Sequence, residues 1–141
     1  LRLRASSMAV KPENTFIKSI HNHLKTTYCE KTNNPYRSGT ADVWYSGNKG
    51  DLWVEYKFLP RIPRSLEILP DLTPRQRRWL NARYDEGRNV AVILGCPDGG
   101  VIYRDKKWNS ALATEDLEAL IMPRKDIARW IYDQVGRSEC P

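Results

Sequence analysis

The sequence predicts an α/β domain with a mixed central β-sheet flanked by helices. Two observations indicate this fold class. Segments of helical period and segments of strand period alternate along the 141-residue chain, as in a sheet covered by helices. The segment Asn89 to Gly95 is an almost unbroken apolar run, which is typical of a strand buried on both faces. We expect one domain over residues 8–141, because this length has room for a single core. Residues 1–7 are expected to be an added leader or a disordered terminus.

The first half of the chain predicts a helix, a loop and a β-hairpin. Apolar residues at three- and four-residue spacing predict a helix from Pro12 to Thr26. The segment Cys29 to Gly39 lacks a sustained period and contains Asn, Pro and Gly, so a loop is expected. Two strand patterns, Ala41 to Ser46 and Leu52 to Phe58, flank the turn residues Gly47 to Gly50. A hairpin is therefore expected.

The second half predicts a long loop, a capped helix, a strand pair and two further helices. Leu59 to Leu72 holds three prolines and is long for a connection, which is typical of a functional loop. Thr73 and Gln76 form a capping box at the start of a helix from Pro74 to Glu86. The elements expected after this helix are strands at Asn89–Gly95 and Val101–Tyr103 and helices at Thr114–Ile121 and Pro123–Val135.

The composition favours an anionic partner. An excess of Lys and Arg gives a formal net charge of +6, and nucleic acid is the first candidate because phosphates release counterions on neutralisation. A basic surface that serves only solubility is the alternative. Cys29, Cys96 and Cys140 are widely spaced, which excludes a zinc ribbon or a four-cysteine cluster within one chain and favours a reducing compartment. No apolar run reaches about 20 residues, so no membrane partner is expected.

One strand carries two charges on a single face. Side chains alternate along a strand, so Trp53, Glu55 and Lys57 share one face of the segment Leu52 to Phe58. Burying an acid and an ammonium is costly unless they pair, bind a metal or face a cleft. The hairpin brings Asp42 within reach of Glu55, and two carboxylates form an oxygen-rich site for Mg²⁺ or Mn²⁺. An ordinary surface ion pair on a solvated edge strand is the alternative.

The residues Asp42 and Glu55-Tyr56-Lys57 resemble the D…(D/E)XK signature of the PD-(D/E)XK, or restriction-endonuclease-like, superfamily of nucleases. The resemblance extends to stretches that are similar in order and spacing to stand-alone VRR-NUC nucleases of phage or bacterial type. These stretches are Ser38–Trp44, Glu55–Lys57, Leu72–Leu80 and Gly87–Ile93. The resemblance implies an αβββαβ core, a Mg²⁺- or Mn²⁺-dependent nuclease, and a location in the cytoplasm of a bacterial or infected host cell.

The resemblance also implies a role for each residue of the motif. Asp42 and Glu55 would coordinate the metal together with the backbone carbonyl of Tyr56. Lys57 would position or activate the attacking water and stabilise charge that develops on the phosphate.

Two further residues each have a structural and a functional interpretation. Gln76 matches a glutamine that such nucleases place beside the catalytic lysine, but its role in the capping box is sufficient by itself. Glu13 lies on the inward side of the first helix, where related nucleases carry an additional acidic metal ligand. A favourable helix dipole explains a first-turn Glu equally well.

Basic residues outside the motif are candidates for binding DNA phosphates, although a solvated surface is the more common fate of such residues. They are Lys31, Arg37, Arg61, Arg64, Arg75 and Arg78. We expect an endonuclease that acts on branched DNA, as Holliday-junction resolvases do, because so small a domain has few elements for reading sequence. A homodimer would place two sites on two strands. A nicking or flap nuclease, a non-catalytic nucleic-acid-binding module and an interaction domain without a nucleic-acid role are the alternatives.

Overall fold

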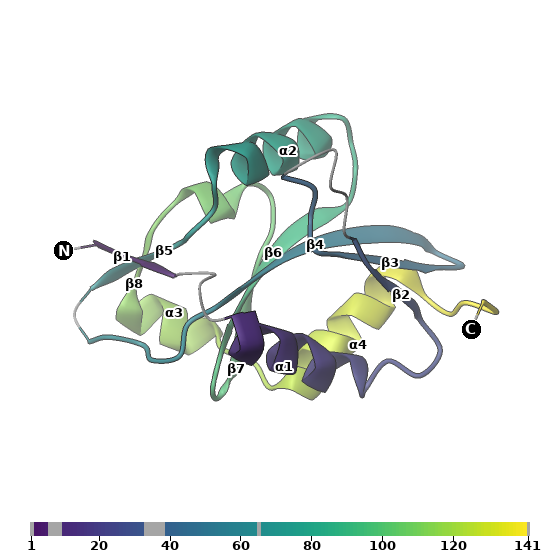
Figure 1. The fold of residues 1–141 in the computed structure, drawn as a ribbon, viewed down its shortest axis with the longest axis horizontal. Helices are drawn as coiled ribbons and strands as arrows, with labels where there is room; N and C mark the ends of the chain where they lie inside the picture. Colours follow the sequence, from purple (N-terminus) through teal and green to yellow (C-terminus); the bar gives the residue numbers. More distant parts are fainter. Residues whose placement is uncertain (1, 6–9, 33–38, 65, 141) are drawn as a thin grey trace.

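The structure is a computed structural model that describes residues 2–5, 10–32, 39–64 and 66–140. Its centre is a five-stranded sheet in the order β2-β3-β4-β6-β7, with helices on both faces (Figure 1). The five strands are β2 (Tyr28–Lys31), β3 (Val43–Gly47), β4 (Gly50–Phe58), β6 (Val90–Cys96) and β7 (Gly99–Tyr103). The helices are α1 (Val10–His21), α2 (Pro74–Asp85), α3 (Thr114–Leu120) and α4 (Arg124–Val135).

The pairing of the strands makes this sheet mixed. β4 and β6 run parallel, whereas β2 with β3, β3 with β4, and β6 with β7 are antiparallel. A parallel neighbour requires a crossover, and α2 lies in the connection between β4 and β6. The order α1, β2, β3, β4, α2, β6 is the expected αβββαβ core. The predicted fold class, a mixed central sheet flanked by helices, is therefore confirmed.

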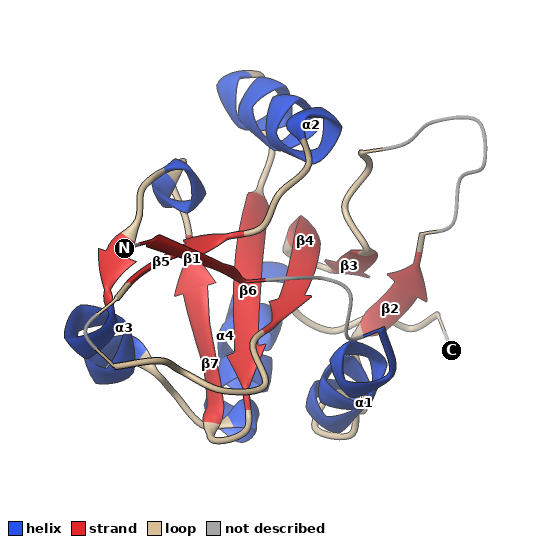
Figure 2. Ribbon diagram, turned by 60° about the vertical axis from the view of Figure 1, so that its left-hand side comes forward, coloured by secondary structure: helices blue, strands red, loops and turns tan. Residues whose placement is uncertain are grey.

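Two apolar layers hold the helices to the sheet. On one face, side chains of α1 and α4 pack against β3 and β4, with Ile20, Tyr45, Tyr56 and Ile131 fully buried. On the other face, Leu80 of α2 joins a second cluster with residues of β6 and β7. β6 is buried along its whole length, as expected for a strand covered on both sides. Figure 2 shows α2 on the side of the sheet opposite α1.

A second, three-stranded sheet in the order β1-β5-β8 was not predicted. Its strands are β1 (Arg2–Ala5), β5 (Glu67–Pro70) and β8 (Leu112–Ala113), and the short 3₁₀ helix η1 (Lys107–Asn109) precedes β8. β5 lies inside the predicted loop Leu59–Leu72, where Ile68 and Leu69 are buried and fold back onto the core. β1 lies in the segment expected outside the domain and pairs in parallel with β5.

Two boundaries near the N-terminus also differ from the prediction. The predicted helix Pro12–Thr26 ends at His21, because the N–H groups of His23 and Leu24 bond three residues back, to the carbonyls of Ile20 and His21. The predicted loop Cys29–Gly39 begins with strand β2, which pairs antiparallel with β3 at the sheet edge. Residues 33–38 of that loop lie outside the described residues.

The helix α2 confirms the capping signals of the sequence. The Thr73 side chain accepts a hydrogen bond from the backbone N–H of Gln76, and the Gln76 side chain accepts one from the backbone N–H of Thr73. The helix stops next to Gly87, whose φ of 81° is a conformation that glycine adopts easily. No helix among the described residues is long and apolar enough to span a bilayer.

Candidate active site

The centre of the candidate site is a buried ion pair on β4. Glu55 and Lys57 are each 1% exposed, and Lys57 Nζ lies 3.6 Å from Glu55 Oε2. The two residues share a face of β4 because side chains alternate along a strand. Removing two charges from water is costly, and a long ion pair recovers only part of that cost. The alternative of a solvated surface pair is therefore excluded.

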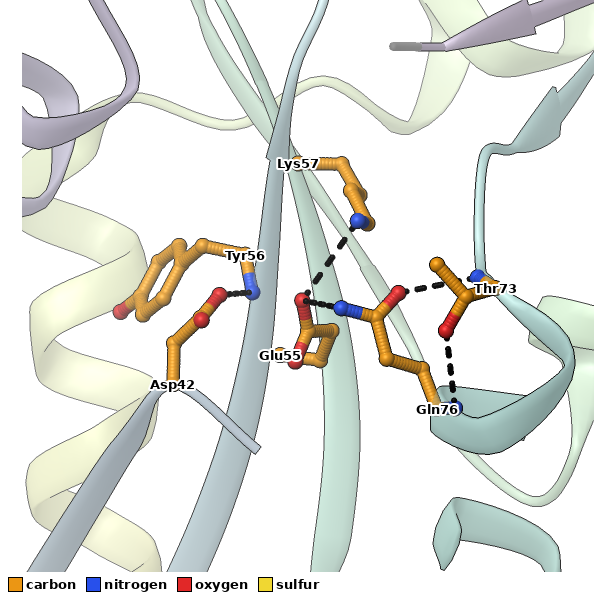
Figure 3. Close-up of polar contacts among 6 residues, drawn as sticks. All are labelled: Asp42, Glu55, Tyr56, Lys57, Thr73 and Gln76. Atoms are coloured by element: carbon orange, nitrogen blue, oxygen red, sulfur yellow. Dashed lines mark hydrogen bonds and ion pairs between the residues drawn. The ribbon is translucent and has the colours of Figure 1, made fainter. Parts of the chain in front are cut away.

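Asp42 meets this pair where β3 stops pairing with β4. The last ladder partners are Val43 and Val54, which brings the preceding Asp42 next to Glu55 as predicted. Asp42 Oδ2 accepts a hydrogen bond of 2.9 Å from the backbone N–H of Tyr56 (Figure 3). The Asp42 carboxylate thus pairs with a backbone N–H group beyond the end of the β3–β4 pairing. This structural role is compatible with a second role as a metal ligand.

Gln76 connects helix α2 to Glu55. Its Oε1 accepts from the Thr73 backbone at 3.0 Å, and its Nε2 donates to Glu55 Oε2 at 3.2 Å (Figure 3). The capping interpretation and the active-site interpretation of Gln76 are thus compatible, since one amide does both. The capping box fixes the side chain that holds one oxygen of Glu55.

Three carboxylates share one electrostatic environment. Burial, and next the charge of Asp42, raise the pKa of Glu55 well above its ordinary value, and Lys57 opposes this. Burial, and next Asp42, raise the pKa of Glu13 to about 7. Glu13 therefore lies near the site, although it comes from α1. Glu55 and Glu13 therefore resist ionisation beside Asp42 when no cation is bound.

The donor set fits a divalent cation that takes two carboxylates. Glu55 Oε1 and Glu13 Oε2 are buried and have no hydrogen-bond partner among the described residues. In that part of the chain, no group of three or more His, Cys, Asp or Glu side chains forms a metal-binding cluster. Mg²⁺ commonly binds one or two carboxylates and completes its shell with water and substrate phosphate. Asp42 and Glu55 meet that requirement, and Glu13 as a third ligand stays a prediction.

The fold of this chain is similar to that of a solved structure. The chain is similar to the Hjc of Archaeoglobus fulgidus, a Holliday junction resolvase from an archaeal hyperthermophile, with a TM-score of 0.53 and 14% sequence identity. The match covers 86% of this chain and 98% of that one. This chain shares the fold of that resolvase. No family model and no curated protein matches the sequence. The likeness to Hjc supports the predicted fold class, a mixed central sheet flanked by helices, and the VRR-NUC type stays a prediction.

The predicted phosphate-binding residues are spread over several elements. Lys31 lies on β2, where its Nζ donates to Asn14 of α1 at 3.0 Å. Arg75 and Arg78 are exposed on α2, and Arg61 and Arg64 are exposed in the segment before β5. Arg64 lies among the acids Glu67, Glu115 and Glu118. Because these carboxylates repel phosphate, Arg64 is a weaker candidate for phosphate binding than the other arginines. Arg37 lies outside the described residues. The Hjc comparison does not test these residues, so their role in DNA binding stays a prediction.

Sequence reasoning missed a chain of hydrogen bonds beneath the site. His21 Nε2 lies 2.8 Å from Tyr45 Oη, and Tyr45 Oη lies 2.5 Å from Tyr56 Oη. Tyr56 stands between Glu55 and Lys57 in sequence, so this chain supports the backbone of the motif from the opposite face of β4. The sequence signal was the aromatic residue in the middle of the motif, but its partners come from α1 and β3 and only the fold reveals them.

Proposed function

We propose that this chain is a Mg²⁺- or Mn²⁺-dependent endonuclease that hydrolyses phosphodiester bonds of branched DNA. The observation that carries the proposal is the buried Glu55–Lys57 pair beside Asp42, with Glu55 Oε1 unpartnered among the described residues. An acid kept in so costly a place indicates a use for its charge. The shared fold with a nuclease supports the same proposal.

The residues of the site divide the chemistry between them. Asp42 and Glu55 would hold the cation, with the Tyr56 carbonyl as a backbone ligand, and Gln76 holds Glu55 in place. A bound Mg²⁺ or Mn²⁺ supplies Lewis-acid polarisation of phosphate oxygen and lowers the pKa of its water. Lys57 offers three N–H donors. It would position the attacking water and stabilise negative charge that develops on the phosphate.

Selectivity for branched DNA is the finer part of the proposal. The similar protein Hjc is a Holliday junction resolvase, and a domain of this size has few elements for reading base sequence. Such a domain would therefore recognise the shape of the DNA and not its base sequence. We include in the proposal a homodimer that offers two sites, membership of the VRR-NUC type, and a location in the cytoplasm of a bacterial or infected host cell.

Cleavage of labelled DNA tests the proposal directly. The purified chain is incubated with four-way junction, flap, duplex and single-stranded DNA in Mg²⁺, Mn²⁺ or EDTA. We expect cutting of the branched substrates with either metal and none in EDTA. Glu55→Gln and Asp42→Asn keep side-chain size and remove the charge, so both should lower the rate by at least about a hundredfold. Lys57→Met keeps the aliphatic stem and should have a similar effect.

The matched control is Glu86→Gln, which removes a carboxylate at the C-terminal end of α2, where Glu86 pairs only with Arg83 among the described residues. It should leave the rate unchanged. Absence of cutting under all conditions, despite salt-sensitive DNA binding, would favour the non-catalytic nucleic-acid-binding module. Preference for a flap or a single nick would select the alternative nuclease types.

A further inference from the structure

A row of aromatic side chains crosses the face of the sheet that carries the acids. Tyr28 of β2, Trp44 of β3, Trp53 of β4 and Trp79 of α2 follow one another with ring-centre distances of 5.4, 5.6 and 5.8 Å. Trp44 and Trp53 are stacked, with 13° between their planes. We call these four residues the aromatic row. Its inner end is capped by the guanidinium of Arg83, 5.9 Å from the Trp79 ring.

The middle of the row lies next to the candidate active site. Trp44 and Trp53 are cross-strand partners on β3 and β4. Asp42 precedes Trp44 by two residues, and Glu55 follows Trp53 by two. Two residues of a strand span about 6.5 Å, which is about two base steps along a DNA strand. The indoles and the acids can therefore contact the same short stretch of nucleic acid.

Core packing explains only one end of the row. Trp53 and Trp79 pack against the apolar cluster beneath α2, and their contact fixes the helix to the sheet. Trp44 belongs to neither apolar cluster and is only partly buried. Its indole Nε1–H is buried and has no acceptor among the described residues. Figure 2 shows β3 and β2 extending beyond the part of the sheet that α2 overlies.

We infer that Trp44, supported by Trp53 and flanked by Tyr28, stacks with unpaired bases of the DNA strand that enters the active site. This inference rests on the proposed function and specifies its substrate as DNA with unstacked bases next to the cut. Trp44 is partly exposed, and an aromatic side chain is a sequence-tolerant platform, since every base has a π face. The unpartnered indole N–H suits an acceptor on a base or on the sugar-phosphate backbone.

The charges at the two ends of the aromatic row indicate on which side the sugar-phosphate backbone of the DNA would lie. Glu30 lies opposite Trp44 at the sheet edge and accepts a hydrogen bond from Tyr28 at 2.6 Å. An acid there repels phosphate. The opposite end carries Arg83, whose charge is partly neutralised by Glu86, and α2 adds the exposed Arg75 and Arg78. The phosphates should therefore follow α2, with the bases turned toward Trp44. The net charge of +6 favours such a polyanion over an apolar partner protein.

Binding in EDTA tests this inference without requiring cleavage. The affinities of wild type and Trp44→Ala for labelled oligothymidylate and for a duplex of the same length are measured by fluorescence anisotropy. Loss of one stacking platform should weaken oligothymidylate binding about tenfold and leave duplex binding within about twofold. Trp44→Phe should restore most of the affinity, because the ring is kept. Circular dichroism and thermal unfolding confirm that the variants are folded.

The matched control is Trp130→Ala on α4, a half-buried tryptophan that carries the Arg104 guanidinium at 5.5 Å on the other side of the sheet. It should leave both affinities unchanged. Equal weakening of single strand and duplex by Trp44→Ala, or no weakening of either, would overturn the inference. These outcomes are separate from the cleavage test. If the wild type cuts DNA and Trp44→Ala binds oligothymidylate normally, the stacking inference is refuted and the nuclease proposal is not. If Trp44→Ala selectively loses oligothymidylate binding and the wild type cuts no DNA, only the nuclease proposal is refuted.

Discussion

Gln76 has two tasks that a pair of substitutions can separate. Thr73→Ala and Gln76→Ala both remove the capping box of α2, and each should lower the free energy of unfolding by about 1 kcal/mol. Only Gln76→Ala also removes the hydrogen bond to Glu55 Oε2. We therefore expect Gln76→Ala to reduce DNA cleavage at least about tenfold while Thr73→Ala nearly retains it. Urea unfolding and cleavage rates of both variants check this, and equal rates would contradict a positioning role.

His21 should make the protein less stable in mild acid. Burial, and next the charge of Lys31, lower its pKa from 6.5 to about 4. Between these values the unfolded chain binds a proton that the folded chain does not. The contribution of His21 to stability is therefore constant above pH 6.5 and falls as pH decreases toward about 4. His21→Gln keeps a polar atom near the Tyr45 hydroxyl and should flatten this dependence, as seen in urea midpoints across the range.

The control for this pH dependence is His23→Gln, because His23 is exposed two residues further on. Acidic groups with raised pKa values, such as Glu13, act in the opposite direction. Only the difference between variant and wild type therefore isolates His21. A His21→Gln variant with the same slope as wild type would show that the imidazole is accessible to protons in the folded protein.

The residues of the site were predictable to the extent that their positions follow from local sequence. Alternation along β4 placed Glu55 and Lys57 on one face, and the hairpin placed Asp42 beside them. The second contact of Gln76 and the environment of Glu13 depend on how two helices pack, which spacing alone does not determine. The aromatic row was missed for the same reason, since its rings come from β2, β3, β4 and α2.

At the scale of elements, helix α1 depends on a close approach at Gly95 of β6. A Cβ atom at Gly95 would lie 2.6 Å from the Phe16 ring. Gly95→Ala should therefore cost about 1–3 kcal/mol through overpacking. Phe16→Leu removes part of the ring and also costs stability by itself. The double variant should recover part of the loss, with a coupling of about 1 kcal/mol or more in a cycle of urea unfolding experiments. Strictly additive effects would indicate that α1 moves freely.

The elements that the sequence predicted are those with strong local signals. Capping residues mark the start of α2, and an apolar run marks β6. The strands that were missed, β1, β2, β5 and β8, have two to four residues each. A strand this short has too few residues for a periodic pattern, and it exists because a distant segment pairs with it. Prolines within Leu59–Leu72 also concealed β5, which ends at Pro70.

At the scale of the whole molecule, the net charge of +6 indicates where DNA binds only when the positions of the basic residues are known. Arg75 and Arg78 each precede by one residue the α2 positions that face the site, Gln76 and Trp79. Arg129 lies on α4, where it pairs with Asp133, on the other side of the sheet. If DNA lies along α2, the first two arginines contact phosphate and Arg129 does not.

The salt dependence of DNA binding measures this difference. Each phosphate contact adds about −0.9 to the slope of log affinity against log salt on duplex DNA. The double variant Arg75→Gln/Arg78→Gln should therefore reduce the magnitude of the slope by about 2, and Arg129→Gln should leave it unchanged. Anisotropy titrations in EDTA at several salt concentrations provide the slopes. Equal reductions at both places would mean that the basic charge attracts DNA without orienting it, and the site would then require another element to align the strand.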